Sequence, residues 1–127
     1  ILLWGDDFHP INYQQLVAKH RKERNLMTMT VTEAHETMNL LHRDGKVVEY
    51  SKRQSLPNFN GYEAGTSMVS KRLVLLFGRD GKWSWEETVY PKLSGKISAH
   101  MDNTKFWDMG TPDRLSKLVE FLKTKRA

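Results

Sequence analysis

The chain has 127 residues, with 20 lysines and arginines against 15 aspartates and glutamates, and carries a formal charge of +5 at pH 7. A hydrophobic content of 39% suffices for one modest core, so wholesale disorder is excluded and a single domain over residues 1–127 is expected. The longest strongly apolar run, at residues 73–77, is far too short to cross a bilayer. Cysteine is absent, which excludes disulfides, thiolate zinc sites and a cysteine nucleophile.

The chain begins with Ile1 inside an apolar run, and not with methionine, so we expect further residues upstream in the natural protein. A signal peptide is not visible, and the lack of cysteine fits a reducing, cytoplasmic location. Residues 1–4 are apolar on both faces and stop at Gly5-Asp6-Asp7. This pattern predicts a strand buried inside a parallel sheet.

The next segments carry clear local signals. Asn12 is expected to cap a helix, because Gln15 stands where a capping-box partner belongs and core-facing residues recur at helical spacing from Tyr13 to His20. In residues 26–32, methionine and valine alternate with threonine, which predicts a strand. Residues 38–42 and 46–50 flank Asp44-Gly45, a strong hairpin signal because both turn residues tolerate positive φ.

Short elements follow in the second half. Residues 51–62 are expected to form a loop over a site. Strands are predicted at residues 63–69, 96–101 and 105–107, with a short helix at 73–77. Ser84 opens another helix with a capping box, and Pro91 ends or kinks it.

The last helix has the clearest pattern in the chain. Thr111 is expected to cap it, and Pro112 occupies its first turn. Apolar residues then recur at Leu115, Leu118, Val119 and Leu122, which lie on one helical face. The complete order of elements predicts an α/β domain with a mixed sheet flanked by helices. A buried first strand without a preceding partner would leave an open edge, so we expect a homo-oligomer.

Two carboxylates stand at comparable positions in this pattern. Asp6 directly follows the first predicted strand, and Asp108 follows the strand that ends at Trp107. Ligands of open α/β sheets bind beyond the carboxyl ends of strands, and Mg²⁺ is typically held by one or two carboxylates together with substrate phosphates. The same residues are also common in turns and helix caps, so both interpretations stay open on spacing alone.

Seven short segments then form an ordered series: Ile1–Asp6, Ile11–His20, Met27–Val31, Asp44–Tyr50, Glu63–Gly65, Trp85–Leu93 and Phe106–Leu115. Taken in order, they resemble the family of sugar-phosphate nucleotidyltransferases over nearly the whole chain. The closest match is Phe106–Leu115, which is similar to the family's Trp-Ile-Asp-Ile-Gly-Thr-Pro-Glu-Asp-Leu. The resemblance implies the carboxyl-terminal part of a Rossmann-like nucleotidyltransferase domain.

The resemblance also implies a reaction. A sugar 1-phosphate would attack the α-phosphate of an NTP and release pyrophosphate. Asp6 and Asp108 match the two aspartates that hold Mg²⁺, the implied cofactor. Lys52 matches the catalytic lysine that binds the sugar phosphate, and Glu63 and Gly65 match the element over the sugar.

Several features depart from the family's pattern. Its glycine-rich nucleotide loop precedes the Gly-Asp strand, and no such loop occurs in these residues. Ser51 replaces an acidic residue, Arg53 stands where proline is common, and Glu63 replaces asparagine or aspartate. The chain is therefore expected to need upstream residues for catalysis. The alternative is a non-catalytic fragment that binds sugar phosphate or assembles with itself, and the sugar and the nucleotide base stay open.

Other functions find little support. The basic stretches at residues 19–24 and 123–126 accompany no nucleic-acid motif, so a solvated helix face and a charged tail are the simpler interpretation. We expect neither nucleic acid nor a membrane as a partner. His35-Glu36 lacks the second histidine of a zinc metalloprotease motif, and no nucleophile elbow is present.

Overall fold

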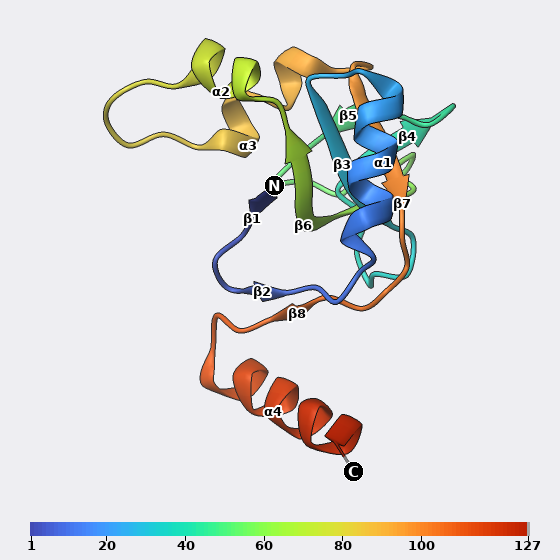
Figure 1. Ribbon diagram of the computed structural model, residues 1–127, viewed down its shortest axis with the longest axis vertical. Coiled ribbons are helices and arrows are strands. Elements are labelled where there is room, and N and C mark those ends of the chain that lie inside the picture. Colours follow the sequence, from blue (N-terminus) through green and yellow to red (C-terminus); the bar gives the residue numbers. More distant parts are fainter. Residues whose placement is uncertain (127) are drawn as a thin grey trace.

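A six-stranded mixed sheet forms the body of the protein in the computed structural model, which describes residues 1–126 (Figure 1). Its strands, in spatial order, are β1 (Leu2–Leu3), β6 (Tyr62–Val69), β3 (Met27–Thr32), β7 (Ile97–Met101), β5 (Lys46–Tyr50) and β4 (Leu40–Arg43). β3 and β7 run parallel, and the other neighbouring pairs are antiparallel. The predicted α/β class with a mixed sheet is confirmed.

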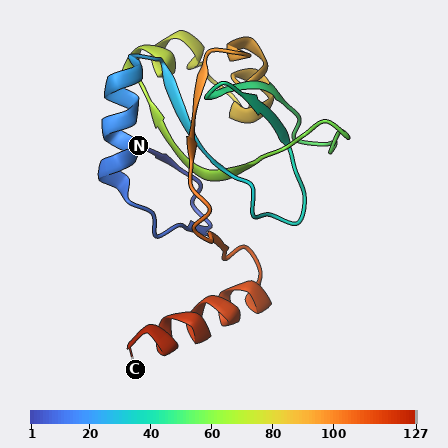
Figure 2. The ribbon, with the colours of Figure 1, turned by 90° about the vertical axis from the view of Figure 1, so that its right-hand side faces the viewer.

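The helices lie around this sheet. α1 (Tyr13–Glu23) covers one face, as the turned view makes clear (Figure 2). α2 (Lys71–Phe77), α3 (Trp85–Thr88) and the short 3₁₀ helix η1 (Pro91–Leu93) gather at one end of the sheet (Figure 1). α4 (Pro112–Arg126) lies beyond the opposite end. No helix within residues 1–126 has both the length and the apolar character to cross a bilayer.

β3 is the centre of the core. Met27, Met29 and Val31 point into a cluster of fully buried side chains, and each such burial contributes roughly 1.5–3 kcal/mol. The threonines on the other face are buried as well. α1 packs there, and the ring of His20 lies 2.9 Å from the Thr28 hydroxyl. The predicted strand is therefore confirmed, with both of its faces covered.

Local signals placed most of the elements correctly. The Asn12 side chain accepts from the Gln15 N–H at 3.2 Å, and the Ser84 side chain accepts from the Glu87 N–H at 3.3 Å. Asp44 and Gly45 have φ values of 51° and 73° and join β4 to β5. The predicted caps and hairpin are therefore confirmed, because these positions are decided by neighbours in the sequence.

The prediction for the first strand is wrong in its direction and its burial. β1 pairs antiparallel with β6, with Leu2 opposite Ser67 and Leu3 opposite Thr66. Ile1 and Leu3 are 62% and 52% exposed. An apolar run shows that a strand can be covered on both faces, but it carries no information about the direction of its neighbour. Within residues 1–126 no second strand pairs with β1, so its apolar side chains stay uncovered.

The apolar face of α4 is also largely uncovered. Leu118 is buried, whereas Leu115, Val119 and Leu122 are 46%, 41% and 39% exposed. The helix packs mainly against β8 (Trp107–Asp108), where the rings of Trp107 and Phe121 stack with centroids 4.6 Å apart. The helix and its amphipathic pattern agree with the sequence, while the spacing alone does not show what covers it.

Candidate functional site

A two-stranded ribbon lies between the main sheet and α4 (Figures 1 and 2). Its strands are β2 (Asp7–Phe8) and β8, which pair antiparallel with Asp7 opposite Asp108. The ribbon therefore joins a segment near the start of the described chain to the segment that leads into α4. It places three aspartates, from these two distant segments, at one end of the sheet.

Asp6 and Asp108 converge on Gly110. The Met109 N–H donates to the Asp6 carbonyl oxygen at 2.6 Å, which holds the two segments together. A Cβ built on Gly110 would lie 3.0 Å from Asp108 Oδ1 and 3.2 Å from Asp6 Oδ2. Both carboxylates thus approach one point, and glycine leaves that point open.

Asp108 is held by two donors. The Gly110 N–H donates to Oδ1 at 2.6 Å, as in a tight turn. The Arg114 guanidinium donates to Oδ2 at 2.5 Å from the first turn of α4. The Arg114 N–H in turn reaches the Thr111 hydroxyl at 3.4 Å, so the predicted cap residue does contact the start of this helix.

Asp7 is a member of this group that the sequence reasoning left out. Burial, together with the negative charges of Asp6 and Asp108, raises the pKa of the Asp7 carboxyl from 3.8 to about 6. Its place directly after Asp6 in the Gly-Asp-Asp series was the available signal. Asp6 lies in a turn, and Asp7 begins β2 opposite Asp108.

Gly65 lies directly against Asp7. Its φ is +75°, a region that favours glycine, and a Cβ added here would lie 2.3 Å from Asp7 Oδ2 and 3.1 Å from Trp4 Cδ1. The space that glycine leaves at this position is filled by the Asp7 side chain, and the predicted role of Gly65 toward a sugar stays a prediction.

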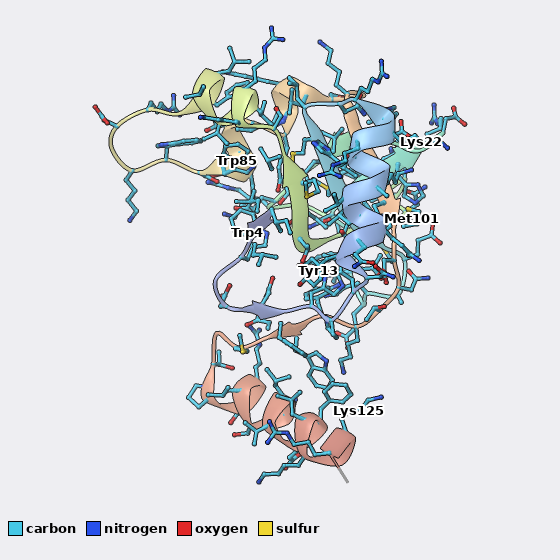
Figure 3. All side chains as sticks on the ribbon, viewed as in Figure 1. Trp4, Tyr13, Lys22, Trp85, Met101 and Lys125 are labelled. Atoms are coloured by element: carbon cyan, nitrogen blue, oxygen red, sulfur yellow. The ribbon has the colours of Figure 1, made fainter. Side chains whose placement is uncertain are left out.

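Glu63 is buried near the start of β6. Its Oε1 accepts from the Trp4 indole Nε1 at 3.0 Å and from the Gly65 N–H at 3.2 Å. Burial raises the pKa of this carboxyl from 4.5 to about 7, although the Trp4 hydrogen bond opposes the shift. Figure 3 shows Trp4 at the end of β1, beside β6. Glu63 thus anchors the segment that precedes Asp6.

Aromatic rings line the neighbouring surface. His35 and Tyr62 stack with ring centroids 3.7 Å apart, and Phe106 continues the stack 5.6 Å from His35. Burial, followed by the charges of Glu63, Asp7 and Asp108, raises the pKa of the Tyr62 hydroxyl. Tyr62 directly precedes Glu63, and Phe106 lies two residues before Asp108, so the rings and these carboxylates adjoin one another along the chain.

Lys52 lies in a different hollow. Its Nζ is 2.6 Å from Glu86 Oε2 on α3, and this hydrogen bond raises the pKa of Lys52. The surface hollow around it measures about 310 Å³ and is lined by Tyr50, Ser51, Lys52, Arg53, Gln54, Glu86, Glu87 and Pro91. Asp6 and Asp108 are not among these lining residues. The structure therefore brings the two aspartates together and joins Glu63 to Gly65, but leaves Lys52 in a hollow of its own.

The donor set of the aspartates suits a hard cation. No group of three or more histidine, aspartate or glutamate side chains within the described chain has a metal-binding arrangement. A pair of carboxylates is nevertheless what Mg²⁺ commonly takes from a protein, because it keeps several waters and substrate oxygens as its other ligands. The opening at Gly110 and the raised pKa of Asp7 are consistent with a place where a positive charge would be favourable.

The sequence matches no protein-family model and no curated protein. Several solved structures do match it. HddC from Yersinia pseudotuberculosis, solved alone and with GMP-PN, has a TM-score of 0.73 at 19% identity, over 94% of this chain and 53% of its own. A Bacillus anthracis putative glucose-1-phosphate thymidylyltransferase, in complex with a sucrose, has a TM-score of 0.73 at 10% identity.

A third match is the inositol-1-phosphate CTP transferase of T. maritima, with a TM-score of 0.63 at 16% identity. The match to each of the last two covers 94% of this chain and 52% of theirs. The described chain thus spans about half the length of these structures. Its fold is therefore the fold of sugar-phosphate nucleotidyltransferases, over about half of their length.

Proposed function

We propose that this chain is part of a sugar-phosphate nucleotidyltransferase that joins a sugar 1-phosphate to an NTP and releases pyrophosphate. The observation that carries the proposal is the convergence of Asp6 and Asp108, which come from distant segments and meet at Gly110. This is the arrangement expected if Mg²⁺ is held between them. The likeness in fold to nucleotidyltransferases supports the same general kind of chemistry.

Asp6 and Asp108 are the proposed metal ligands. Bound there, Mg²⁺ would neutralise phosphate charge and align the reacting groups. The surrounding residues would hold this pair in position: Gly110 leaves the approach open, and the Glu63–Trp4 hydrogen bond anchors the strand before Asp6. The stack of His35, Tyr62 and Phe106 would offer apolar faces for the sugar ring.

Lys52 is the proposed ligand of the sugar phosphate. As a flexible point charge it suits a phosphate group, but it must first leave Glu86. In the transfer step, a phosphate oxygen of the sugar 1-phosphate bonds to the α-phosphorus of the NTP, and the bond from that phosphorus to pyrophosphate breaks. The attacking phosphate is largely dianionic at pH 7, because its second pKa is about 6. The chain therefore needs to supply orientation and positive charge, and no general base.

The complete reaction requires a nucleotide site. The described chain spans about half of its structural relatives, and the family's glycine-rich loop is not among its residues. We therefore assign to these residues the sugar-phosphate and metal side of the reaction. The alternative stays the one that the sequence suggested, a fragment that binds sugar phosphate or assembles with itself without turnover.

Calorimetric titration with a panel of sugar 1-phosphates tests this proposal. The panel is applied with and without Mg²⁺ to the wild-type chain, to Asp108→Asn, and to Asp80→Asn, a matched change at an exposed loop residue. The proposal predicts binding that requires Mg²⁺, is lost in Asp108→Asn and is kept in Asp80→Asn. Binding that ignores both Mg²⁺ and Asp108 would contradict it.

A further inference from the structure

Arg114 occupies one oxygen of a proposed metal ligand. Its guanidinium lies 2.5 Å from Asp108 Oδ2, and the two side chains are 55% and 38% exposed. Ion pairs this open to solvent contribute little to folding, on the order of 0–1 kcal/mol. The contact is therefore poorly explained as a device for stability, and its place beside Asp6 and Asp7 calls for another explanation.

The local charge balance suggests one. Asp6 and Asp108 converge on Gly110, and Asp7 lies opposite Asp108 in the ribbon, so three acidic residues gather at one end of the sheet. Among the ion pairs of residues 1–126, Arg114 with Asp108 is the pair that involves this group. Arg114 therefore supplies the positive charge that contacts Asp108 in this group.

The two oxygens of Asp108 are used differently. Oδ1 accepts from the Gly110 N–H and faces the point shared with Asp6 Oδ2. Oδ2, the other oxygen, carries Arg114. A divalent cation between Asp6 and Asp108 would thus bind the same carboxylate as the guanidinium. Two positive charges on one small carboxylate repel each other, because only a few ångströms separate them.

Resting on the proposed function, we propose that Arg114 is a built-in competitor of the divalent cation. Its guanidinium neutralises Asp108 while no cation is bound, and it leaves Oδ2 when a cation binds. Arginine suits this role because it stays charged at every physiological pH and hydrogen-bonds a carboxylate through a planar fork. The contact sets how much cation is needed to fill the site.

The test is titration of the full chain with Mg²⁺ alone, at constant ionic strength. Arg114→Ala should bind the ion about two- to fivefold more tightly than wild type, the range expected for one exposed ion pair. Lys117→Ala is the matched control, because it removes the same charge from the next turn of α4 without a contact to Asp108. Its affinity should change by less than half as much. Arg114→Lys should lie between wild type and Arg114→Ala.

A second readout makes the result independent of heat changes and of folding. The electron paramagnetic resonance signal of free Mn²⁺ reports binding directly, and circular dichroism checks each variant. If Arg114→Ala fails to fold, the Mg²⁺ affinities of Arg114→Lys and Arg114→Gln are compared with that of Lys117→Ala instead. An Arg114→Ala affinity no tighter than that of Lys117→Ala overturns the inference.

The proposed function fails in a distinguishable way. If wild type binds Mg²⁺ and Asp108→Asn does not, the metal site stands and the Arg114 comparison decides this inference alone. If neither the wild type nor any Arg114 variant binds Mg²⁺ or Mn²⁺, the proposed site itself is refuted, and the inference with it.

Discussion

Trp4 donates its indole N–H to Glu63, 59 positions later in the chain, with 3.0 Å between Nε1 and Oε1. The same carboxylate oxygen accepts the Gly65 N–H at 3.2 Å. One buried acid on β6 thereby holds both the end of β1 and its own strand. Since Asp6 and Asp7 follow Trp4 immediately, this contact fixes where the aspartates can lie.

Glu63 should make stability fall with rising pH. Its pKa is about 7 in the folded chain against 4.5 for the free side chain, so the folded state binds this proton more tightly than the unfolded state. The resulting stabilisation is complete below pH 4.5 and is lost as pH rises through 7. The unfolding free energy should therefore fall by roughly 2 kcal/mol between pH 5 and pH 8 because of this group. Urea denaturation at several pH values measures it.

Glu63→Gln keeps an oxygen for Trp4 and Gly65 but cannot ionise, so its unfolding free energy should vary less over the same pH range. The pKa of Asp7 is also raised, to about 6. Asp7 should therefore leave a smaller decrease of unfolding free energy with pH in Glu63→Gln. Glu120→Gln, at an exposed position on α4, is the control and should behave as wild type. Equal slopes for wild type and Glu63→Gln would refute the role given to this carboxyl.

Gly65→Ala should destabilise the chain more than a positive φ alone explains. Gly81 has a similar φ of +86° but nothing within 4 Å of an added Cβ, whereas at Gly65 the Cβ would meet Asp7 Oδ2 at 2.3 Å. Gly81→Ala should cost about 1 kcal/mol, and Gly65→Ala roughly 2–4 kcal/mol. Chemical denaturation of both variants measures the difference. Adding Asp7→Gly to Gly65→Ala should recover part of the loss, and no recovery would contradict the contact.

Local signals in the sequence were enough to place most elements. The caps at Asn12 and Ser84 and the turn at Asp44-Gly45 depend on residues within one turn of the chain, so a pattern can reveal them. The direction of β1 depends on β6, more than 60 positions later, and the prediction failed there.

The candidate site was predictable in part. Asp6 and Asp108 were singled out because each follows a predicted strand, and the structure does bring them together. The ribbon that joins them has two residues in each strand, too few to show any periodicity. Lys52 pairs with Glu86, and Glu63 pairs with Trp4. Each pair joins distant segments of the chain, so tertiary packing decides these contacts.

Releasing Lys52 should strengthen phosphate binding. Glu86 Oε2 lies 2.6 Å from Lys52 Nζ, and the pair is separated by 34 positions in sequence. In Glu86→Gln the lysine loses its charged partner, so its affinity for a sugar 1-phosphate should rise about two- to fivefold. Calorimetric titration measures this.

Glu87→Gln is the control for Lys52, because it frees Arg53 from a 2.9 Å ion pair in the same hollow and removes the same charge. Glu87→Gln should raise the affinity for a sugar 1-phosphate less than Glu86→Gln does. Lys52→Ala should lower this affinity. If Glu87→Gln and Glu86→Gln strengthen binding equally, the effect is one of general charge, and Lys52 has no special role.

The open edge of β1 should drive self-association. Leu3 is 52% exposed, and no described strand covers that edge. We expect light scattering to show dimers or larger species at high concentration, and Leu3→Lys to shift them toward monomer. Leu122→Lys changes the uncovered apolar face of α4 instead. It is the control that distinguishes association through that face from association through the edge of β1. A monomeric wild-type chain, or dissociation by Leu122→Lys alone, would contradict association through β1.

Asp6 and Asp108 are proposed to hold a divalent cation together. Mn²⁺ added to the ¹⁵N-labelled chain locates such an ion, because it broadens the amide resonances nearest to it. The amides of Asp6 and Gly110 should broaden first, and Asp108→Asn should abolish this broadening. Broadening centred elsewhere, for example at the His42–Glu33 pair 2.9 Å apart, or broadening that survives Asp108→Asn, would contradict it.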